Sequence, residues 1–179
     1  LYTMADALFA ASFLNACLRN ADDITMANIA PLVNQTGPLY VHPEGIVKRT
    51  HFHTMAMYAN ELEECVGAIT INSSKLIHNN TSVNVVDANA TVDKSARKWA
   101  IALINRHPSE SVECKIKTAG RLLNGTFDAT VLAGDSPDAY NDIDNPNRVV
   151  PEKKHMIFRD GVVELPPHSL SIVQVTDEE

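Results

Sequence analysis

The stretch GPLYVHPEGIVKRTHFH, from Gly37 to His53, decides how the first third of this chain is interpreted. It follows a nearly continuous apolar run, Ile24 to Val33, and leads into a helical pattern that reaches about Tyr58. The stretch is punctuated by Pro and Gly and is rich in side chains that bind ligands or titrate. We therefore expect a loop that presents side chains, either as a site of its own or as part of a larger site.

The residues before this loop suggest a helix and then a buried strand. Apolar residues recur at three- and four-residue spacing after Asp6, a suitable N-cap, and this predicts a helix over Asp6–Asn20. The run Ile24–Val33, ITMANIAPLV, is ten residues long and mostly apolar, which favours a strand buried on both faces, as in a parallel sheet.

A second helix is expected after the loop, over Val47–Asn60. Its apolar stripe should consist of Phe52, Met55, Ala56 and Ala59. Helix, buried strand, loop and helix make one and a half α/β units, which cannot close a sheet by themselves.

Beyond Asn60 the apolar period changes from 3.6 residues to 2. Val112, Cys114 and Ile116 alternate with charged residues, which is typical of a half-buried antiparallel strand. Asp160-Gly161 is a hairpin-turn signal between two further strands. About eight short strands separated by turn signals predict a β-sandwich.

Composition excludes several classes of function. The chain has 179 residues, a net charge of −7 and a sequence pI near 5.4, and it shows no basic face for nucleic acid. No apolar run is long enough to span a membrane, and the start has no basic leader. Leu1 is not an initiator Met, so we expect the tail of a longer protein.

Cys17, Cys65 and Cys114 have no metal-ligand or redox-motif spacing. We interpret them as reduced and mostly buried, and this predicts a cytoplasmic protein. Against this stand six glycosylation sequons, although loops rich in Asn, Ser and Thr produce such tripeptides freely. The sequons begin at Asn34, Asn72, Asn79, Asn80, Asn89 and Asn124.

The candidate site residues lie in the opening stretch. His42, Glu44, Lys48 and Arg49 follow the predicted buried strand, and the loops after such strands carry the active sites of α/β barrels. The alternative is that they cap the next helix or are simply solvated.

We predict no metal site and no cofactor. His51 and His53 fall on different sides of a helix and make a poor ligand pair. Trp99 is interpreted as a core residue, with a sugar-stacking platform as the alternative.

Four blocks of the sequence resemble the C-terminal third of glycoside hydrolase family 51 α-L-arabinofuranosidases. They are DALFAASFLNACLRNADDITMANIAPLVN (Asp6–Asn34), GPLYVHPEGIVKRTHFHTMAMYAN (Gly37–Asn60), AYNDIDNPNRVVP (Ala139–Pro151) and VVELPPHSLSIVQV (Val162–Val175). The resemblance implies a mainly β fold: a jelly-roll-like β-sandwich preceded by the last helix–strand–helix of a (β/α)₈ barrel. It places residues 1–60 in the barrel and residues 61–179 in the sandwich.

The same resemblance implies a retaining exo-hydrolase that removes terminal arabinofuranosyl groups from arabinan, arabinoxylan and oligosaccharides. Its two catalytic glutamates would lie upstream of Leu1, so we expect no catalytic residue in this chain and no activity from it alone. Arg49 matches a sugar-contacting position early in the last helix, with Lys48 beside it and His42 and Glu44 at the rim. The implied partners are the sugar substrate, the missing barrel portion and further copies of the chain.

Two alternatives remain open at this stage. One is a non-catalytic sandwich that binds carbohydrate through Trp99 or has only a structural role. The other is a hydrolase of the same family with a xylosidase or endoglucanase preference.

Overall fold

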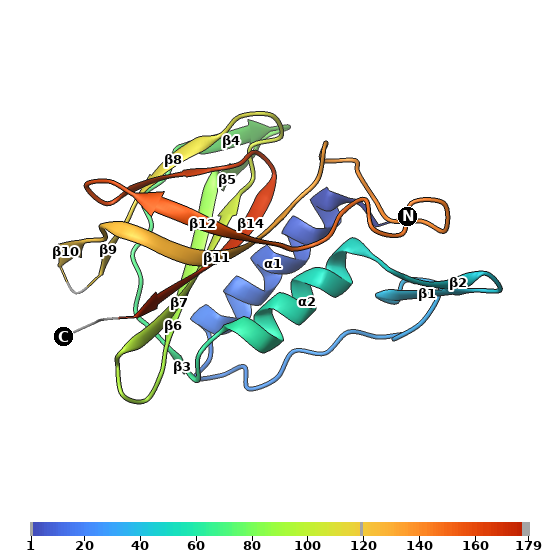
Figure 1. Cartoon of the computed structure of the whole chain (residues 1–179), viewed down its shortest axis with the longest axis horizontal. Helices are drawn as coiled ribbons and strands as arrows, with labels where there is room; N and C mark the ends of the chain where they lie inside the picture. Colours follow the sequence, from blue (N-terminus) through green and yellow to red (C-terminus); the bar gives the residue numbers. More distant parts are fainter. Residues whose placement is uncertain (1, 119, 177–179) are drawn as a thin grey trace.

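The computed structural model describes residues 2–118 and 120–176. Two helices, α1 (Met4–Arg19) and α2 (Thr50–Glu61), pack against an antiparallel β-sandwich, as Figure 1 shows. The strands of the first half are β1 (Leu39–His42), β2 (Gly45–Lys48), β3 (Cys65–Val66), β4 (Lys75–His78), β5 (Thr81–Asn84), β6 (Val86–Val92) and β7 (Lys98–Asn105). The second half contributes β8 (Val112–Lys115), β9 (Lys117–Thr118), β10 (Arg121–Leu122), β11 (Gly125–Ala133), β12 (Glu152–Phe158), β13 (Val162–Leu165) and β14 (Ser169–Thr176).

A six-stranded antiparallel sheet with the order β12-β11-β14-β7-β6-β3 forms the centre of the molecule. Its two central strands are buried on both faces because helices cover one face and further strands cover the other. Along β7, Ala102 and Ile104 face the helices, whereas Ile101 and Leu103 face the second strand layer. The expected β-sandwich is confirmed, and the chain is mainly β.

The second strand layer consists of the antiparallel pair β13–β8 and the hairpin β4–β5. Asp160 and Gly161, both at positive φ, make the tight turn that carries the chain from β12 in one layer to β13 in the other. The predicted turn is therefore confirmed. The alternation at Val112–Ile116 is confirmed too, because Val112 and Cys114 of β8 pack into the core between the layers.

Helix α1 begins two residues earlier than expected because Thr3, not Asp6, is its N-cap. The Asp6 carboxylate accepts hydrogen bonds from the Thr3 backbone N–H (2.7 Å) and hydroxyl (3.0 Å), as in a capping box. The next N–H groups, of Met4 and Ala5, donate to carbonyls of Ala139 and Pro137. The polar loop before β12 thus holds the start of α1.

Hydroxyl groups and the buried Met57, rather than the predicted apolar stripe, make the contact between α1 and α2. Three side chains of α2, spaced four residues apart, donate to backbone carbonyls of α1 that are also four residues apart. The pairs are Thr50 to Thr3 (2.7 Å), Thr54 to Ala7 (3.2 Å) and Tyr58 to Ala11 (3.2 Å). Phe52, Met55 and Ala56 are only half-buried and Ala59 is exposed. Small side chains on α1 allow the close approach, and the two helices run parallel.

A buried polar cluster joins α1 to the sandwich. Asp87 of β6, 4% exposed, receives Arg19 of α1 at 3.0 Å and Arg106 at 2.9 Å. Arg106 also donates to the Ser12 hydroxyl (2.9 Å), and Asn15 approaches Asp87 at 3.4 Å. Because the carboxylate is shared by two guanidinium groups, the buried charge is compensated.

The segment Ile24–Val33 does not form the predicted buried strand in this chain. The segment has no strand structure apart from a single bridge between Val33 and Leu39, and nearly all of its residues are exposed. It runs back along the helices from the end of α1 towards β1 (Figure 1). A parallel strand is buried only when neighbours pair with it on both sides, and the described residues offer it no such neighbours.

The cysteines agree with only part of their prediction. All three are free thiols, and burial raises the pKa of the half-buried Cys114 thiol. Cys65, however, is exposed, because β3 is a two-residue strand at the sheet edge.

Candidate functional site

The stretch Gly37–His53 forms a β-hairpin rather than an irregular loop. Strands β1 and β2 pair from Leu39↔Lys48 to His42↔Gly45, with Pro43-Glu44 as the connection. Alternating residues on both sides of Pro-Glu-Gly could have signalled this hairpin. The hairpin leads directly into α2, so that its base lies beside the start of that helix (Figure 1).

Arg49 stands at the base of the hairpin and braces the turn before β1. One of its Nη atoms donates to the Gln35 and Gly37 carbonyls, each at 2.8 Å. The guanidinium also lies over the rings of Tyr2 (5.3 Å) and Tyr40 (5.2 Å). Within the described residues, its Nε and other Nη atoms make no hydrogen bond, so they remain able to donate outward.

The other three predicted site residues do not converge on Arg49. Lys48 is exposed, with its Nζ 5.3 Å from the centre of the Phe52 ring. His42 and exposed Glu44 lie at the far tip of the hairpin, where the Glu44 N–H donates to His42 Nδ1 at 3.3 Å. Three residue steps, about 10 Å of strand, separate the tip from the base. The hairpin therefore has two sites of polar groups rather than one cluster.

Buried Asn141 fixes the base of the hairpin to the sandwich side of the molecule. Its Nδ2 donates to the Lys48 carbonyl (2.9 Å) and to the Val149 carbonyl (2.8 Å), and its Oδ1 accepts from the Val149 N–H (2.7 Å). The Ala139–Pro151 block thus positions both the hairpin and α1.

His51, considered from the sequence only as half of a poor metal-ligand pair, is a buried group. It is 3% exposed, neither ring nitrogen makes a hydrogen bond of good geometry although the Thr36 backbone lies nearby, and its ring lies 4.1 Å from that of Tyr2. Burial lowers the pKa of His51, and the nearby Arg49 charge lowers it further. His51 borders a cavity of about 280 Å³ between α1, α2 and residues 27–30. No local pattern distinguishes this histidine from an exposed one.

His53 has the same character. It is 8% exposed and its Nε2 has no partner. Burial, with a contribution from Lys48, lowers the pKa of His53 to about 4. In residues 2–118 and 120–176, no three His, Cys, Asp or Glu side chains are grouped as metal ligands.

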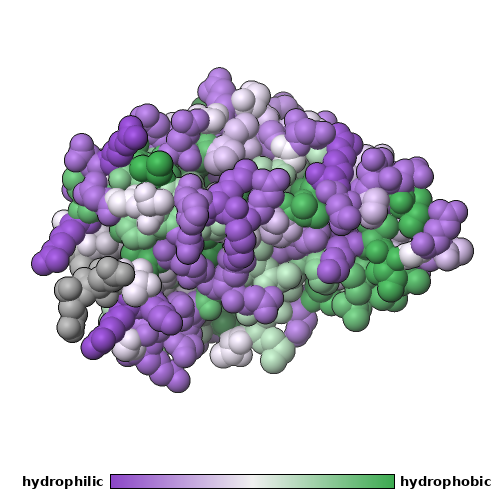
Figure 2. Space-filling model, viewed as in Figure 1, coloured by the Kyte–Doolittle hydropathy of each residue, from purple (hydrophilic) through white to green (hydrophobic). Residues whose placement is uncertain are grey.

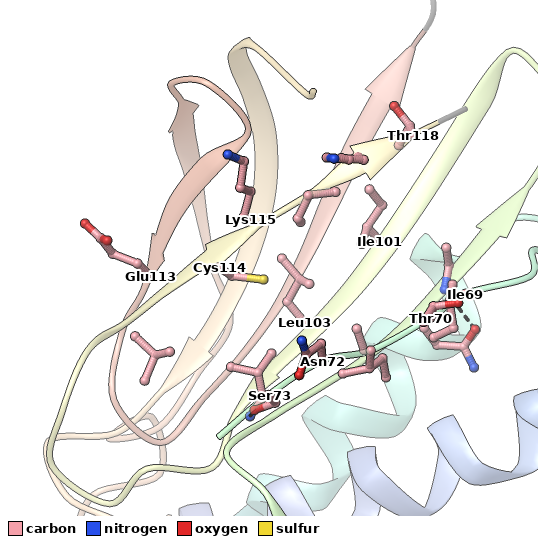
Figure 3. A pocket seen from close by; sticks show the side chains of 18 of the residues that line it. Ile69, Thr70, Asn72, Ser73, Ile101, Leu103, Glu113, Cys114, Lys115 and Thr118 are labelled. Carbon is pink, nitrogen blue, oxygen red and sulfur yellow. Dashed lines mark hydrogen bonds between the residues drawn. The ribbon is translucent and has the colours of Figure 1, made fainter. Parts of the chain in front are cut away.

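A larger cleft of about 920 Å³ opens between the two layers of the sandwich. Its floor is apolar, with Ile101 and Leu103 of β7, and Cys114 of β8 points into it (Figure 3). Trp99 lines one end, where the indole packs so closely on Gly67 that a Cβ there would lie 2.9 Å from the ring. Trp99 is half-buried, so it is both a core residue and part of the cleft wall.

Exposed apolar side chains gather on the helical side of the molecule. Figure 2 shows a hydrophobic area at the end that carries the β1–β2 hairpin. The exposed fractions are large for apolar residues: Phe9 75%, Phe13 57%, Met26 73%, Leu32 62% and Ile46 64%. Monomeric proteins rarely expose so many large apolar groups on one side, which indicates a surface that another body covers.

The comparisons with known proteins agree on one family. The family described as "Alpha-L-arabinofuranosidase C-terminal domain" matches residues 1–169. An intracellular exo-alpha-(1->5)-L-arabinofuranosidase of Streptomyces lividans is 28% identical over 84% of this chain. The alpha-L-arabinofuranosidase C of Emericella nidulans is 26% identical over 78% of it. A family 51 alpha-L-arabinofuranosidase from Bifidobacterium longum superimposes with a TM-score of 0.85 and 25% identity, covering 99% of this chain and 34% of its own.

These matches define the class. An antiparallel β-sandwich with two parallel helices against one sheet face is the C-terminal architecture of glycoside hydrolases of this kind, and the chain belongs to the alpha-L-arabinofuranosidase C-terminal domain family. The chain spans 23% of the Streptomyces relative and 28% of the Emericella relative. No helix in the described part of the chain is long and apolar enough to cross a membrane.

Proposed function

We propose that this chain is the C-terminal part of a retaining, exo-acting α-L-arabinofuranosidase that acts on arabinan, arabinoxylan and their oligosaccharides. The observation that carries the proposal is the family match over residues 1–169. The relatives of known structure and sequence are arabinofuranosidases, and each is much longer than this chain.

The proposal explains the exposed apolar side of the molecule. In it, α1 and α2 are the last two helices of a (β/α)₈ barrel, and the segment Ile24–Val33 becomes the eighth strand when its neighbours are present. Residues 1–60 then belong to the barrel and residues 61–179 to the sandwich. Retaining hydrolysis uses two carboxyl groups about 5–5.5 Å apart, and we place both in the part of the barrel that precedes this chain.

Within that enzyme the hairpin contributes to the rim of the sugar site. Arg49 keeps donor groups free after bracing the Gln35–Gly37 turn, and a guanidinium of this kind donates to sugar hydroxyls. Lys48 is the second cation at the base, and His42 and Glu44 extend the rim at the hairpin tip. The proposed role of these four residues is substrate positioning.

The test compares two proteins with an aryl α-L-arabinofuranoside and, in parallel, an aryl xyloside and a soluble β-glucan. The protein that includes the preceding barrel segments should hydrolyse the arabinofuranoside, and this chain alone should not. Hydrolysis by this chain alone would contradict the proposal. Faster turnover of the xyloside or the glucan than of the arabinofuranoside would show that the enzyme prefers that substrate instead. In the longer protein, Arg49→Ala should raise KM more than it lowers kcat, with exposed Arg121→Ala as the control.

A second candidate function is non-catalytic sugar binding in the cleft, favoured by the position of Trp99 along its wall. Isothermal titration of this chain with arabino-oligosaccharides tests it. Binding that Trp99→Phe weakens while the melting temperature holds would support the cleft. The absence of a heat of binding would exclude sugar binding in the cleft, and Trp99 would then have only a structural role in the cleft wall.

The apolar side of the isolated chain also supports self-association. We propose that this chain forms homo-oligomers through the surface around Phe13, Met26 and Leu32, to be checked by light scattering against a Met26→Lys variant. A cytoplasmic location has support from the three free cysteines and from the Streptomyces relative, which is an intracellular enzyme. The sequon pattern argues against that location.

A further inference from the structure

The sequons are more frequent than the composition of the chain produces. The sequence has 15 asparagines, and 22 of its 179 residues are Ser or Thr. A random order of these residues would give about two Asn-x-Ser/Thr tripeptides, and six are present. Turns favour asparagine itself, but they do not require Ser or Thr two positions later. The excess of sequons lies in these Ser and Thr residues.

The fold separates these asparagines into accessible and inaccessible groups. Five of the six are exposed: Asn34, Asn72, Asn79, Asn80 and Asn124. Asn34 accepts from the Val41 N–H (2.7 Å) beside the β1–β2 hairpin, and Asn72 lines the cleft between the two layers. This leaves Asn79, Asn80 and Asn124 as the candidates on the outer surface of the sandwich. Asn89 is 1% exposed and fully engaged, since its Nδ2 donates to the Asn15 carbonyl and its Oδ1 accepts from the Ala90 N–H. A glycan at Asn89 is incompatible with the packing of α1 on β6.

Asn79 and Asn80 form the tip of the β4–β5 hairpin. Both have positive φ, 44° and 65°, as in a type I′ turn, and His78 pairs with Thr81 across it. Asn80 makes no side-chain hydrogen bond within the described residues. Asn124 lies just before β11, and its Nδ2 donates one of its two hydrogens to the Leu122 carbonyl at 3.2 Å. Both places project from the sandwich and leave an amide hydrogen free.

The same hairpin carries a feature that a glycan would protect. Strands β4 and β5 pair only with each other among the described strands, so each has an open edge. Ile77 is 77% exposed and Val83 43% exposed on this hairpin. An open edge with exposed β-branched residues invites pairing with other chains, and native proteins cover or blunt such edges.

We propose that the sandwich is an N-glycosylated surface, with one glycan at Asn79 or Asn80 and one at Asn124. The asparagine Nδ2 forms a bond to the anomeric carbon of the first sugar of a lipid-linked oligosaccharide. The bond from that carbon to the lipid diphosphate breaks, the diphosphate leaves with its electron pair, and the amide loses one proton. Adjacent asparagines leave room for one glycan, so the hairpin tip carries one. The proposal places the protein in the secretory route and is independent of its catalytic role.

The experiment expresses the full chain behind a secretory leader in yeast. The secreted protein should show two steps of apparent mass that a peptide N-glycosidase removes. Because this enzyme hydrolyses the glycosylated asparagine to aspartate, its use in heavy-oxygen water should label the hairpin tip and Asn124. Thr126→Ala should remove one step, and the double variant Thr81→Ala/Ser82→Ala should remove the other. Exposed Ser111→Ala, outside any sequon, should remove none.

The outcomes decide the proposal without reference to folding yield, because glycans are attached before folding ends. Secreted protein whose apparent mass the peptide N-glycosidase does not change would overturn it. So would label confined to Asn34, Asn72 or Asn89, or steps that persist in the triple variant. Deglycosylated protein should aggregate at lower concentration than glycosylated protein, and Ile77→Lys should reduce that difference.

Discussion

Two apolar stretches of this molecule differ in burial: one forms a buried strand and the other is exposed. Lys98–Asn105, KWAIALIN, is β7 and is buried over its last six residues between β6 and β14. Ile24–Val33, ITMANIAPLV, has a similar share of apolar residues and lies exposed along the helices. The difference is that β7 has a pairing partner on each side and a packing layer on each face, whereas the second stretch has neither among the described residues.

This contrast shows that burial of an apolar run is favourable but occurs only where pairing strands and packing layers are available. The sandwich buries β7 with its own residues and leaves apolar side chains exposed mainly on the β4–β5 hairpin. The helical side leaves Ile24–Val33 exposed, which is why we propose a covering barrel for that side alone.

The sharpest test of the contrast truncates one leucine in each stretch. Leu103→Ala in β7, where Leu103 is 1% exposed, should lower the free energy of unfolding by about 2–5 kcal/mol. Leu32→Ala, at a side chain that is 62% exposed, should change it by about 0.5 kcal/mol or less. Urea unfolding followed by circular dichroism measures both. Equal losses would show that Ile24–Val33 is packed in this chain.

The next test breaks the link between the two regions. Asp87→Ala leaves Arg19 and Arg106 without their shared carboxylate and should cost about 3 kcal/mol. Asp128→Ala removes an exposed carboxylate whose ion pair is with exposed His155, so its effect should be near zero. If urea unfolding gave the two variants the same stability, the ion pairs of Asp87 would not stabilise the packing of α1 on the sheet.

A smaller effect is expected within the helical region. Thr54→Val keeps the shape of the side chain but loses the hydroxyl that donates to the Ala7 carbonyl, and should cost about 1 kcal/mol. Thr176→Val, at an exposed position of β14 outside any sequon, is the matched control. Thermal unfolding of the two variants side by side measures the difference, and a neutral Thr54→Val would assign the helix contact to packing alone.

The helical region should also carry a pH dependence of its own. Burial and Lys48 lower the pKa of His53 to about 4, below the ordinary value of about 6.5. The unfolded chain therefore binds more protons between these values, and stability falls as the pH drops from about 6.5 towards 4. His53→Gln should reduce the difference in melting temperature between pH 7 and pH 4.5. An unchanged difference would show that His53 is solvated.

The sequence predicted the sandwich because its signals are local. Alternation at Val112–Ile116 and the Asp160-Gly161 turn depend on neighbouring residues and a packed face, all of which lie within this chain. The first helix was predicted for the same reason, with its start misplaced by the choice of Asp6 over Thr3 as N-cap.

The errors arose where the outcome depends on distant partners. Ile24–Val33 needed pairing strands that the described chain does not supply. In α2 the apolar residues were assigned to the buried face, whereas Thr50, Thr54 and Tyr58 meet α1, because carbonyls there can accept their hydroxyls. Of the predicted site residues, Arg49 proved to be tied into the fold, which only the position of the Gln35–Gly37 turn could reveal. Their part in sugar binding stays a prediction.

The four-residue spacing of the hydroxyl contacts has a consequence for how the two helices find their alignment. A slide of one helical turn would bring Thr54 to the Thr3 carbonyl and Tyr58 to the Ala7 carbonyl, so the contacts by themselves permit more than one alignment. Tyr58 removes the ambiguity, because its single O–H proton is shared between the Ala11 carbonyl at 3.2 Å and the closer Asn15 Oδ1 at 2.7 Å, beside Asp87. The polar cluster around Asp87 therefore selects one of several near-equivalent alignments of α1 and α2. Because the β1–β2 hairpin leads into α2, this alignment also fixes the position of the hairpin.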